Sequence, residues 1–272
     1  MNATTGMTIL VTGATDGIGK QTALELARRG HHVLVHGRSE ARVAATRDEL
    51  VRQVKDARVD GVTFDLASLA AVRAGAARLL DQHERLHLLI NNAGVFAHER
   101  RVSADGFELT FAVNHLAHFL LTELLLPRLQ ASGPARVVNV SSQAHQGSRL
   151  DVNDLQLTRG YSGFAAYAAS KLANVLHANA LAARLDATRV TANSLHPGVI
   201  GTKLLKEGWG ASGATLEQGA RTSLYVALEP KLAGVSGRYF SDSREARPST
   251  AALDVRLGQA LEDASRKLVG LV

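Results

Sequence analysis

The chain has 272 residues, enough for one α/β domain with a sizeable core, and its lack of cysteine excludes disulfides and thiol chemistry. Lys plus Arg number 31 and Asp plus Glu 25, but these charges are scattered, so we expect a bland basic surface or a small phosphorylated ligand rather than a nucleic acid. No signal peptide is evident, and the apolar stretches are interrupted before 18 residues, so we expect a cytoplasmic protein without a membrane segment.

Short apolar, β-branched runs alternate along the chain with amphipathic stretches of helical length. The runs predicted as strands are TILVTG, HVLVHG, VDGVTFDL, LHLLINNAG, ARVVNVSS, RVTANSLHPG and GRYFS. Helical stretches such as Lys20 to Arg29 and Ser68 to Glu84 lie between most of them. Because the strands lack polar alternation, helices should cover both faces of the sheet. The pattern predicts a single α/β domain over 1–272, doubly wound, with a parallel sheet of about seven strands.

A glycine-rich turn follows the first predicted strand. In ILVTGATDGIGKQTALELARRG the strand ends at Thr12, and Gly13, Gly17 and Gly19 precede a helix. Glycines permit a tight turn and a close approach to a pyrophosphate, and the helix N-terminus offers free N–H groups. The turn therefore indicates a dinucleotide site, with an ordinary strand-to-helix turn as the alternative.

The end of the second predicted strand, HVLVHGRSE, indicates which dinucleotide is bound. An acidic residue about 20 residues past the glycine turn holds the ribose of NAD, whereas an arginine accommodates the 2′-phosphate of NADP. Here Gly37 and Arg38 stand at this point, with Arg42 one helical turn on as a second basic candidate. The pattern favours NADP(H), and a solvated surface arginine is the alternative.

The stretch HERLH, residues 83–87, matches the H-E-x-x-H pattern of zinc hydrolases. That chemistry needs both histidines on one helix face. His83 and Glu84 end a predicted helix, however, and His87 begins a predicted strand. The break between the two histidines predicts that no metal is bound.

The stretch YAASK places Tyr167 and Lys171 at positions i and i+4, where helical side chains share a face. A neighbouring ammonium should stabilise the phenolate and lower the phenol pKa. Such a pair suits proton transfer in a carbonyl/alcohol couple, and two polar helix residues are the alternative.

Taken together and in this order, TGATDGIG, NNAG, VNVSS, YAASK and HPG resemble the short-chain dehydrogenase/reductase family from about Thr8 to near the C-terminus. The stretches FAVNHLAHFLLTELLLPRL, YAASKLANVLHANALAARL, HPGVIGTKLL and GRYFSDS are further similar to the branch containing retinol dehydrogenases, the WW-domain oxidoreductase and protochlorophyllide reductases. The resemblance implies a Rossmann fold and an NADP(H)-dependent carbonyl reductase or alcohol dehydrogenase. Its partner would be a small-molecule carbonyl or alcohol, and family members are frequently dimers or tetramers.

The resemblance implies a catalytic tetrad of Asn114, Ser142, Tyr167 and Lys171. Tyr167 would protonate the substrate oxygen, and Ser142 would hydrogen-bond it. We choose Ser142 over Ser141 because the catalytic serine of the family is usually the second of the pair. Lys171 would bind the nicotinamide ribose, and Asn114 would support a water-linked proton relay to Lys171.

The same resemblance implies a set of cofactor contacts along the chain. They are Gly13, Gly17, Ile18 and Gly19 at the phosphates, Arg38 at the 2′-phosphate, Asp65 and Leu66 at the adenine, Asn92, Ala93 and Gly94 at the adenosine ribose, Tyr167 and Lys171 at the nicotinamide ribose, and Pro197, Gly198, Val199 and Thr202 at the nicotinamide.

Other features leave alternatives open. Trp209, in the glycine-rich substrate-loop region 203–215, could cap the substrate pocket or pack on the surface. The insert 143–166 should help form the pocket rim. His115 and His118 are interpreted as core or interface residues rather than bases. An NADPH-binding sensor or scaffold without turnover is the alternative to an enzyme.

Overall fold

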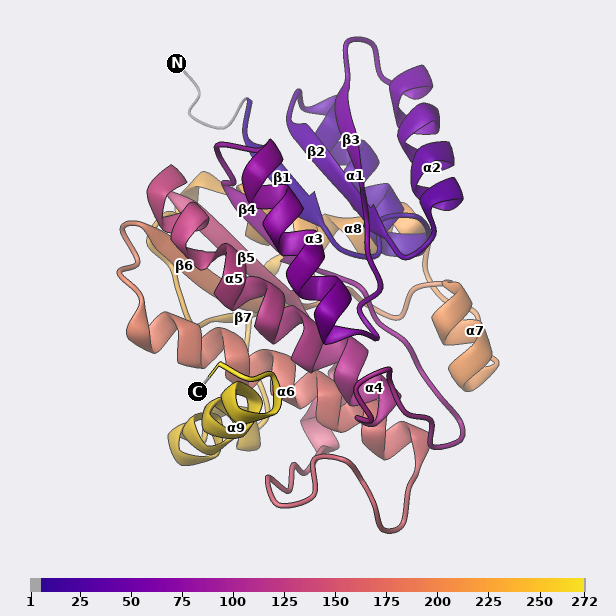
Figure 1. Cartoon of the computed structure of the whole chain (residues 1–272), viewed down its shortest axis with the longest axis vertical. Coiled ribbons are helices and arrows are strands. Elements are labelled where there is room, and N and C mark those ends of the chain that lie inside the picture. Colours follow the sequence, from indigo (N-terminus) through magenta and orange to yellow (C-terminus); the bar gives the residue numbers. More distant parts are fainter. Residues whose placement is uncertain (1–5, 272) are drawn as a thin grey trace.

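A computed structural model describes residues 6–271 of the chain. Figure 1 shows a central sheet with helices on both of its faces. Within the described residues the sheet has eight strands in the order β3-β2-β1-β4-β5-β6-β7-β8. The strands are β1 Thr8–Val11, β2 His32–Gly37, β3 Arg58–Thr63, β4 Leu88–Asn91, β5 Ala135–Val140, β6 Val190–His196, β7 Tyr239–Ser241 and β8 Arg244–Ala246.

Most helices begin where a serine, threonine or aspartate caps the first turn, as at Ser39, Ser68 and Ser162. The helices are α1 Gly17–Arg28, α2 Glu40–Gln53, α3 Leu69–Gln82, α4 Leu109–Phe111, α5 Ala117–Ser132, α6 Gly163–Arg184, α7 Lys203–Trp209, α8 Leu216–Leu228 and α9 Val255–Leu268. A π-helical turn, η1 Ala112–Leu116, joins α4 to α5, and short 3₁₀ turns are η2 Gln143–Gly147, η3 Pro230–Leu232 and η4 Ala251–Leu253.

The strands are buried on both faces, as their unbroken apolar runs predict. Successive residues of β1 alternate between two cores. Leu10 belongs to the core formed with α3, α5 and α6. Ile9 and Val11 belong to the core formed with α1, α2 and α8. The doubly wound α/β fold predicted from the sequence is confirmed.

The sheet differs from the predicted one at its last edge. Strands β1 to β7 are parallel, as predicted, but β8 pairs with β7 in the antiparallel direction. Asp242 and Ser243 connect them, with φ values of 51° and 55°. Two residues with positive φ match the twist of a tight hairpin. The sequence did not indicate this hairpin because neither residue is a glycine.

The segment from α4 through α5 corrects one expectation about the apolar stretches. Among residues 6–271, one helix, Leu109–Ser132, is long and apolar enough to cross a membrane, with a mean hydropathy of 1.4 in its most apolar window. The expectation that every apolar stretch is interrupted before 18 residues is therefore wrong here, because Glu123 and Arg128 are the only charged residues of this helix. In the fold 83% of that window is buried, as in a core helix.

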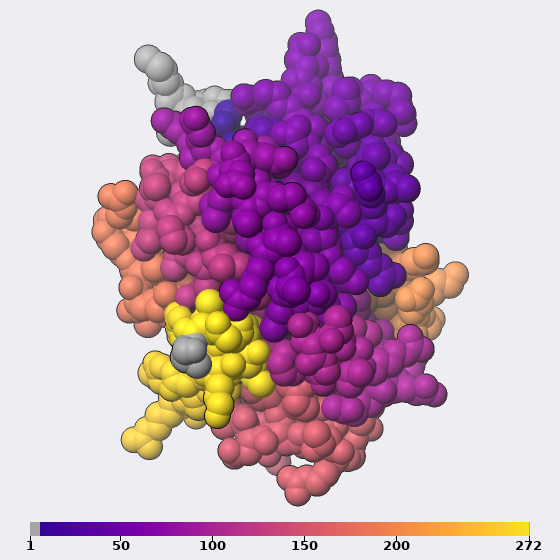
Figure 2. Space-filling model, in the orientation of Figure 1, coloured from indigo at the N-terminus to yellow at the C-terminus, as the bar shows by residue number. Residues whose placement is uncertain are grey.

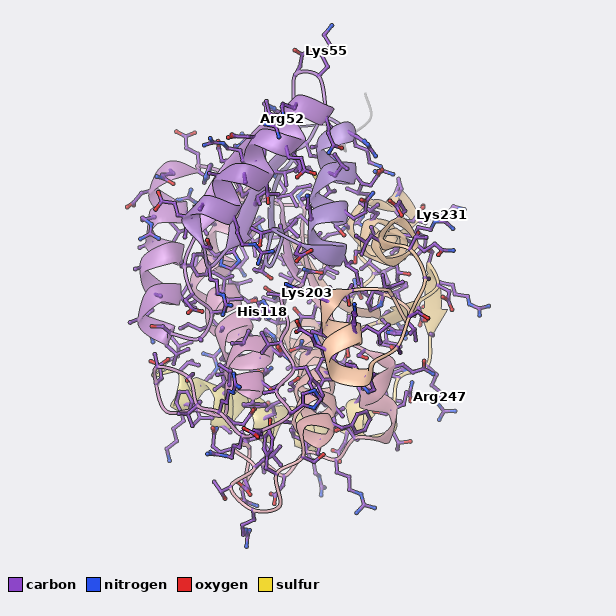
Figure 3. All side chains as sticks on the ribbon, turned by 90° about the vertical axis from the view of Figure 1, so that its right-hand side faces the viewer. Arg52, Lys55, His118, Lys203, Lys231 and Arg247 are labelled. Carbon is purple, nitrogen blue, oxygen red and sulfur yellow. The ribbon has the colours of Figure 1, made fainter. Side chains whose placement is uncertain are left out.

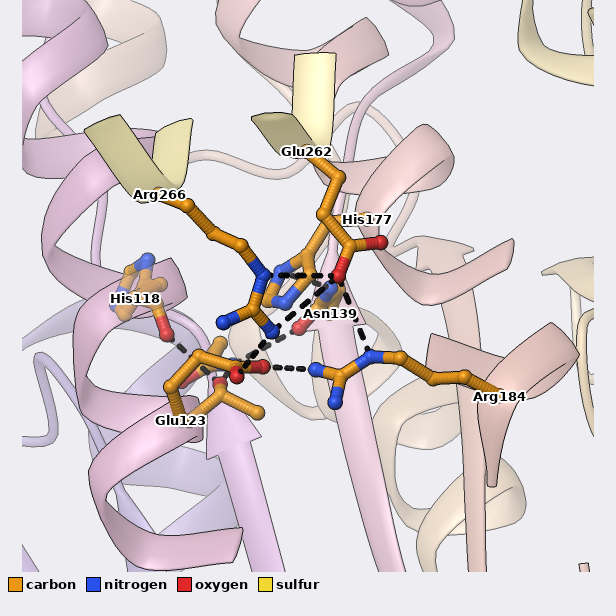
Figure 4. A network of polar contacts seen from close by, with 9 residues as sticks. His118, Glu123, Asn139, His177, Arg184, Glu262 and Arg266 are labelled. Atoms are coloured by element: carbon orange, nitrogen blue, oxygen red, sulfur yellow. Dashed lines mark hydrogen bonds and ion pairs between the residues drawn. The ribbon is translucent and has the colours of Figure 1, made fainter. Parts of the chain in front are cut away.

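The C-terminal helix α9 packs on the outside of α5 and α6 (Figure 2, yellow). Figure 4 shows the charged side chains that join the three helices. Arg266 Nη2 lies 2.7 Å from Glu123 Oε2, and Arg184 Nε lies 3.3 Å from Glu262 Oε1. Arg184 also pairs with Glu123. Each carboxylate therefore contacts both guanidinium groups, and the four form a closed network.

Candidate active site

The strand order creates a crevice at one edge of the sheet. Strand β1 lies between β2 and β4, so the chain leaves it in opposite directions on its two sides. In doubly wound sheets, ligands bind outside the carboxyl ends of the strands at such a point. The loops after β1, β4, β5 and β6 all start at this edge, and they carry the predicted motifs.

The glycine turn after β1 packs against the loop after β4. A Cβ on Gly13 would lie 2.8 Å from the Cα of Ala93, and one on Gly19 would lie 2.4 Å from Asn92 Nδ2. Asn92 Nδ2 in turn donates to the carbonyl of Thr12 at 2.8 Å. Only glycine fits these positions, and the bare backbone leads directly into α1. We call this turn, residues 13–19, the glycine cradle. It fits a dinucleotide pyrophosphate.

The turn after β6 closes the other side of the cradle. Gly198 has a φ of 98°, and Val199 beside it is exposed. Thr202 caps α7 by accepting a hydrogen bond from the Leu205 N–H at 3.2 Å. Its methyl carbon would lie 3.5 Å from a Cβ on Gly17. The predicted nicotinamide and phosphate segments therefore adjoin each other.

Two arginines lie beside the glycine turn at the end of β2. Arg38 follows the strand directly and is exposed. Arg42 Nη2 donates to the Thr15 carbonyl at 3.3 Å and pairs with Asp16 Oδ2 at 3.1 Å. Arg42 is therefore already tied to the turn, whereas Arg38 points from the strand end toward solvent.

The two residues after β3 that were predicted to border the adenine differ in burial. Asp65 is exposed, and its Oδ1 accepts a hydrogen bond from the Ala67 N–H at 2.9 Å. Leu66 is buried in the core against α3 and α5. Only the backbone of Leu66 could therefore border a bound nucleotide.

Asn114 lies in the π-helical turn η1, fully buried. Its Oδ1 accepts from the Val95 N–H at 2.8 Å, and its Nδ2 donates to Ser170 Oγ at 3.0 Å. These partners satisfy the amide, as its burial requires. A π turn inside an α-helix is rare and frequently marks a functional site.

Lys171 and Asn114 meet at Gly94, the last residue of NNAG. A Cβ on Gly94 would lie 3.4 Å from Lys171 Nζ and 3.6 Å from Asn114 Oδ1. Lys171 Nζ donates to the Val140 carbonyl at 3.1 Å and lies 5.5 Å from the centre of the Tyr167 ring. Residues from the loop after β4, from η1 and from α6 thus converge on one point.

The two serines after β5 have different surroundings. Ser141 is buried, and its hydroxyl donates to the Lys171 carbonyl at 2.7 Å. Ser142 caps the 3₁₀ turn η2 by accepting from the Ala144 N–H at 3.2 Å, and it lies within hydrogen-bond reach of Tyr167. His145 contacts the backbone of Ser142, with its Nδ1 2.6 Å from the Ser142 carbonyl.

Burial governs the protonation of the tyrosine–lysine pair. It raises the pKa of Tyr167 to about 12, and the hydrogen bond with Ser142 only partly opposes this rise. It lowers the pKa of Lys171 to about 8. The expectation that the phenol pKa is lowered is wrong for this structure, because desolvation of the phenolate sets the direction of the shift. Tyr167 is therefore a phenol at neutral pH.

His118 links the glycine turn to the Asn114 segment, a role that the sequence did not indicate. Its Nε2 lies 2.9 Å from Thr12 Oγ1, and its Nδ1 lies 3.0 Å from the Asn114 carbonyl. Burial lowers the pKa of His118 to about 3, so the ring stays neutral and cannot serve as a solvent-exchanging base. His115 is also buried, with its Nε2 2.9 Å from Ser265 Oγ. Both are core residues, as predicted.

Aromatic rings surround the hydroxyl end of the site. The ring centre of Trp209 lies 5.2 Å from that of Tyr167 and 4.9 Å from that of Phe96. Phe164, half exposed, lies 6.5 Å from Trp209. Trp209 therefore contacts the tyrosine although its ring is partly exposed, and a role as a cap over the substrate pocket stays a prediction. Phe96 was not singled out from the sequence, although only Val95 separates it from NNAG.

The insert 143–166 packs against the loop after β4. The Tyr161 hydroxyl donates to the Ala97 carbonyl at 3.0 Å. Gln156 accepts from the Glu108 N–H at 2.7 Å and from Arg100 Nε at 3.1 Å. These bonds attach the insert beside Phe96, on the aromatic side of the site.

HERLH has the helix-to-strand break that was predicted. His83 is the residue that ends α3, and His87 precedes β4. His87 Nδ1 accepts from the Thr8 N–H at 3.0 Å, at the far edge of the sheet from the cradle. The two histidines do not share a helix face.

A family model described as short chain dehydrogenase matches residues 7–211. The chain belongs to this family of oxidoreductases. It is 43% identical to human retinol dehydrogenase 13 over 98% of this chain and 85% of that protein. It is 40% identical to human retinol dehydrogenase 14, over 98% and 87% of the two chains.

Solved structures agree with this assignment. A crystal structure of an uncharacterised protein from Mycobacterium paratuberculosis has a TM-score of 0.82 and 33% identity, over 98% of this chain and 94% of that one. A structure described as an NAD(P)-dependent gluconate 5-dehydrogenase from Beutenbergia cavernae, with bound NADP at low occupancy, has a TM-score of 0.72 and 28% identity, over 88% and 95%.

Proposed function

We propose that the protein is an NADP(H)-dependent oxidoreductase that interconverts a carbonyl compound and its alcohol. The observation that carries the proposal is the convergence of Tyr167, Lys171, Asn114 and Ser142 beside the glycine cradle. Fold alone would not establish the reaction, because one fold hosts many activities. Four side chains suited to a single proton transfer, next to a dinucleotide cradle, restrict it to this class.

The cofactor would supply a hydride to the carbonyl carbon. Tyr167 would give its proton to the substrate oxygen, and its high pKa in the cofactor-free protein suits a donor. Ser142 would hydrogen-bond the same oxygen. Lys171, near Gly94, would hold the nicotinamide ribose and return a proton to Tyr167, with Asn114 fixing the backbone of Val95 beside it.

NADP(H) is the cofactor that we propose, on two grounds. Arg38 is exposed at the end of β2 in place of the acidic residue that would hold an NAD ribose. Arg42 adds a second guanidinium on the same rim. A structural neighbour that contains NADP supports the choice.

The substrate that we propose is a bulky apolar alcohol or aldehyde. Phe96, Phe164 and Trp209 surround the hydroxyl end of the site, and an apolar substrate would bury its surface against these rings. The relatives named retinol dehydrogenases support a substrate of this chemistry. We further propose that the protein works in the cytoplasm.

The proposal is tested by following NADPH absorbance against retinaldehyde and a panel of smaller aldehydes, ketones and quinones. Turnover should fall by at least about 10²-fold in Tyr167→Phe, because this variant loses the proton donor but keeps the ring. NADPH should still bind to the variant, as measured by fluorescence. Near wild-type turnover in Tyr167→Phe would show the mechanism to be wrong.

A sensor or scaffold that binds NADPH without turnover is the alternative. The complete tetrad argues against it, since a sensor needs no proton donor. Tight NADPH binding with no oxidation across the whole panel would favour the sensor.

A further inference from the structure

A cluster of two histidines and an aspartate lies at the opposite edge of the sheet from the cradle. His32 is the first residue of β2, Asp60 lies in β3, and His83 ends α3. One ligand atom of each lies within 4.8 Å of the other two. Arg38, by contrast, lies past the last residue of β2, so the length of this strand separates the cluster from the cofactor edge.

We propose that His32, Asp60 and His83 bind a divalent transition metal ion of the zinc class. Two imidazole nitrogens and one carboxylate oxygen form a donor set that zinc takes in proteins, with a water as the fourth ligand. The ion would join β2, β3 and the end of α3, and it would take no part in the hydride transfer, because the cofactor cradle and the tetrad lie at the other edge of the sheet.

The distance between His32 and Asp60 needs only a small adjustment. His32 Nε2 and Asp60 Oδ2 lie 2.7 Å apart as a hydrogen-bonded pair. Two ligands of a tetrahedral zinc ion stand roughly 3.3 Å apart, given metal–ligand bonds near 2.0–2.1 Å. The carboxylate of Asp60 is more than half exposed, so rotation of its side chain opens the pair without moving the strand.

The two imidazoles are already placed for a shared ion. Their ring centres lie 5.5 Å apart with an interplanar angle of 66°. The guanidinium of Arg128 donates to the carbonyls of His83 and Leu80, which fixes the end of α3. His32 is fixed in the ladder between Thr8 and Arg58. Because rigid elements hold both histidines, binding costs little ordering.

The surrounding charge bears on affinity. Arg58, the register partner of His32, is a cation on the adjoining strand, and its guanidinium donates to the Gly30 carbonyl at 3.4 Å.

This site departs from the sequence-based expectation that the chain binds no metal. That expectation rested on His83 and His87 lacking a common helix face, and those two histidines remain apart. The partners of His83 come instead from β2 and β3, and no spacing in the sequence connects them.

Calorimetric titration of tag-free, chelator-stripped protein with zinc chloride tests the proposal. We expect one ion per chain, and a rise in Tm of roughly 5 °C at a hundredfold excess over the Kd. His83→Ala and Asp60→Asn should each weaken binding by at least about 10-fold. Glu84→Gln, an exposed change in the same HERLH stretch, should bind zinc as the wild type does.

Asp60→Asn keeps a nearly isosteric side chain at an exposed position, so it remains informative even if His83→Ala fails to fold. Turnover measured with and without the chelator should be unchanged, since the site lies at the other edge of the sheet. Absence of zinc binding in the wild type, or full binding in both ligand variants, would overturn the proposal. Loss of binding in Glu84→Gln would do so too, by pointing to HERLH itself.

Discussion

At the scale of single residues, the burial of Lys171 lowers the stability of the fold, although the residue suits the proposed reaction. The side chain is buried, so its ammonium is not hydrated. The ammonium donates one hydrogen bond, to the Val140 carbonyl. Burial lowers its pKa from 10.5 to about 8, which corresponds to a cost of about 3 kcal/mol for holding the charge at neutral pH. The hydrogen bond to the Val140 carbonyl offsets part of this desolvation cost. This cost is consistent with the proposed role of Lys171 toward the cofactor and Tyr167.

We therefore expect Lys171→Met to lose turnover and gain stability at pH 7, by about 1 kcal/mol in the free energy of unfolding of the cofactor-free protein. Between pH 8 and pH 10.5 the unfolded lysine binds a proton that the folded one has lost. Wild-type stability rises with pH across this window, so the advantage of the variant should shrink. Urea unfolding at pH 7 and pH 10 measures both. A less stable variant at pH 7, or a constant difference, would contradict the assignment.

Arg38 should set the preference between cofactors. One hydrogen bond to a charged phosphate is worth about 1.5–3 kcal/mol, or roughly 10- to 150-fold in affinity. Arg38→Ala should remove most of the NADPH advantage in kcat/KM and leave NADH nearly unchanged. Because the side chain is exposed, added salt should weaken the wild-type preference. Arg47→Ala, which removes an exposed arginine of α2 that is paired with Asp48, is the matched control. An unchanged cofactor ratio in Arg38→Ala would defeat the assignment.

At the scale of elements, α7 is the helix least committed to the core. None of its residues is buried, and Figure 3 shows it on the outside of the molecule, with Lys203 at its start. Trp209, at its last position, lies against the rings of Tyr167 and Phe96. The Glu207 carbonyl also lies 2.8 Å from His98 Nε2. A helix with no buried residue and few such contacts can move at low cost, which suits a cover over the site.

Trp209→Ala should therefore raise KM for a bulky apolar substrate by about 10-fold, since an aromatic contact is worth about 0.5–1.5 kcal/mol beyond the area that it buries. The kcat for a small aldehyde should change little, because Tyr167 keeps its other neighbours. Trp209→Phe should restore most of the affinity. Equal KM values for wild type and Trp209→Ala with the bulky substrate would show that the ring does not line the substrate path.

At the scale of the whole molecule, the closed network of Glu123, Arg184, Glu262 and Arg266 attaches the C-terminal helix to the core (Figure 4). Its carboxylates are nearly buried, whereas the arginines are about a third exposed. Removal of one partner leaves charges without their counterparts, which is costly when they are buried. Exposure of the arginines reduces that cost.

We expect Glu123→Gln to lower the free energy of unfolding by about 2 kcal/mol, a figure discounted for the exposed arginines. The Tm should fall by roughly 4–8 °C for a domain of this size. Asp48→Asn, which breaks an exposed pair with Arg47, should change Tm by less than about 1 °C. Thermal unfolding at low salt compares the two. Equal Tm values would mean that the network contributes nothing to the attachment of α9.

The elements and motifs that could be predicted from the sequence depend on local order. The alternation of strands and helices, the glycine cradle and the shared face of Tyr167 and Lys171 all follow from the nature and spacing of neighbouring residues. Five ordered motifs also indicated the family, which the comparisons confirm. The roles given to the tetrad and to Arg38 stay predictions that the experiments above test.

Only the tertiary structure decided which distant segments meet, and how much water reaches them. It brought Gly94, Asn114 and Lys171 to one point, set Trp209 against Tyr167, and placed His83 beside His32 and Asp60. It also reversed the expected shift of the tyrosine pKa, because desolvation depends on all the atoms that enclose a group. The β7–β8 hairpin likewise depends on tertiary structure. It formed without a glycine because contacts across the sheet outweigh the local conformational preference of its two turn residues.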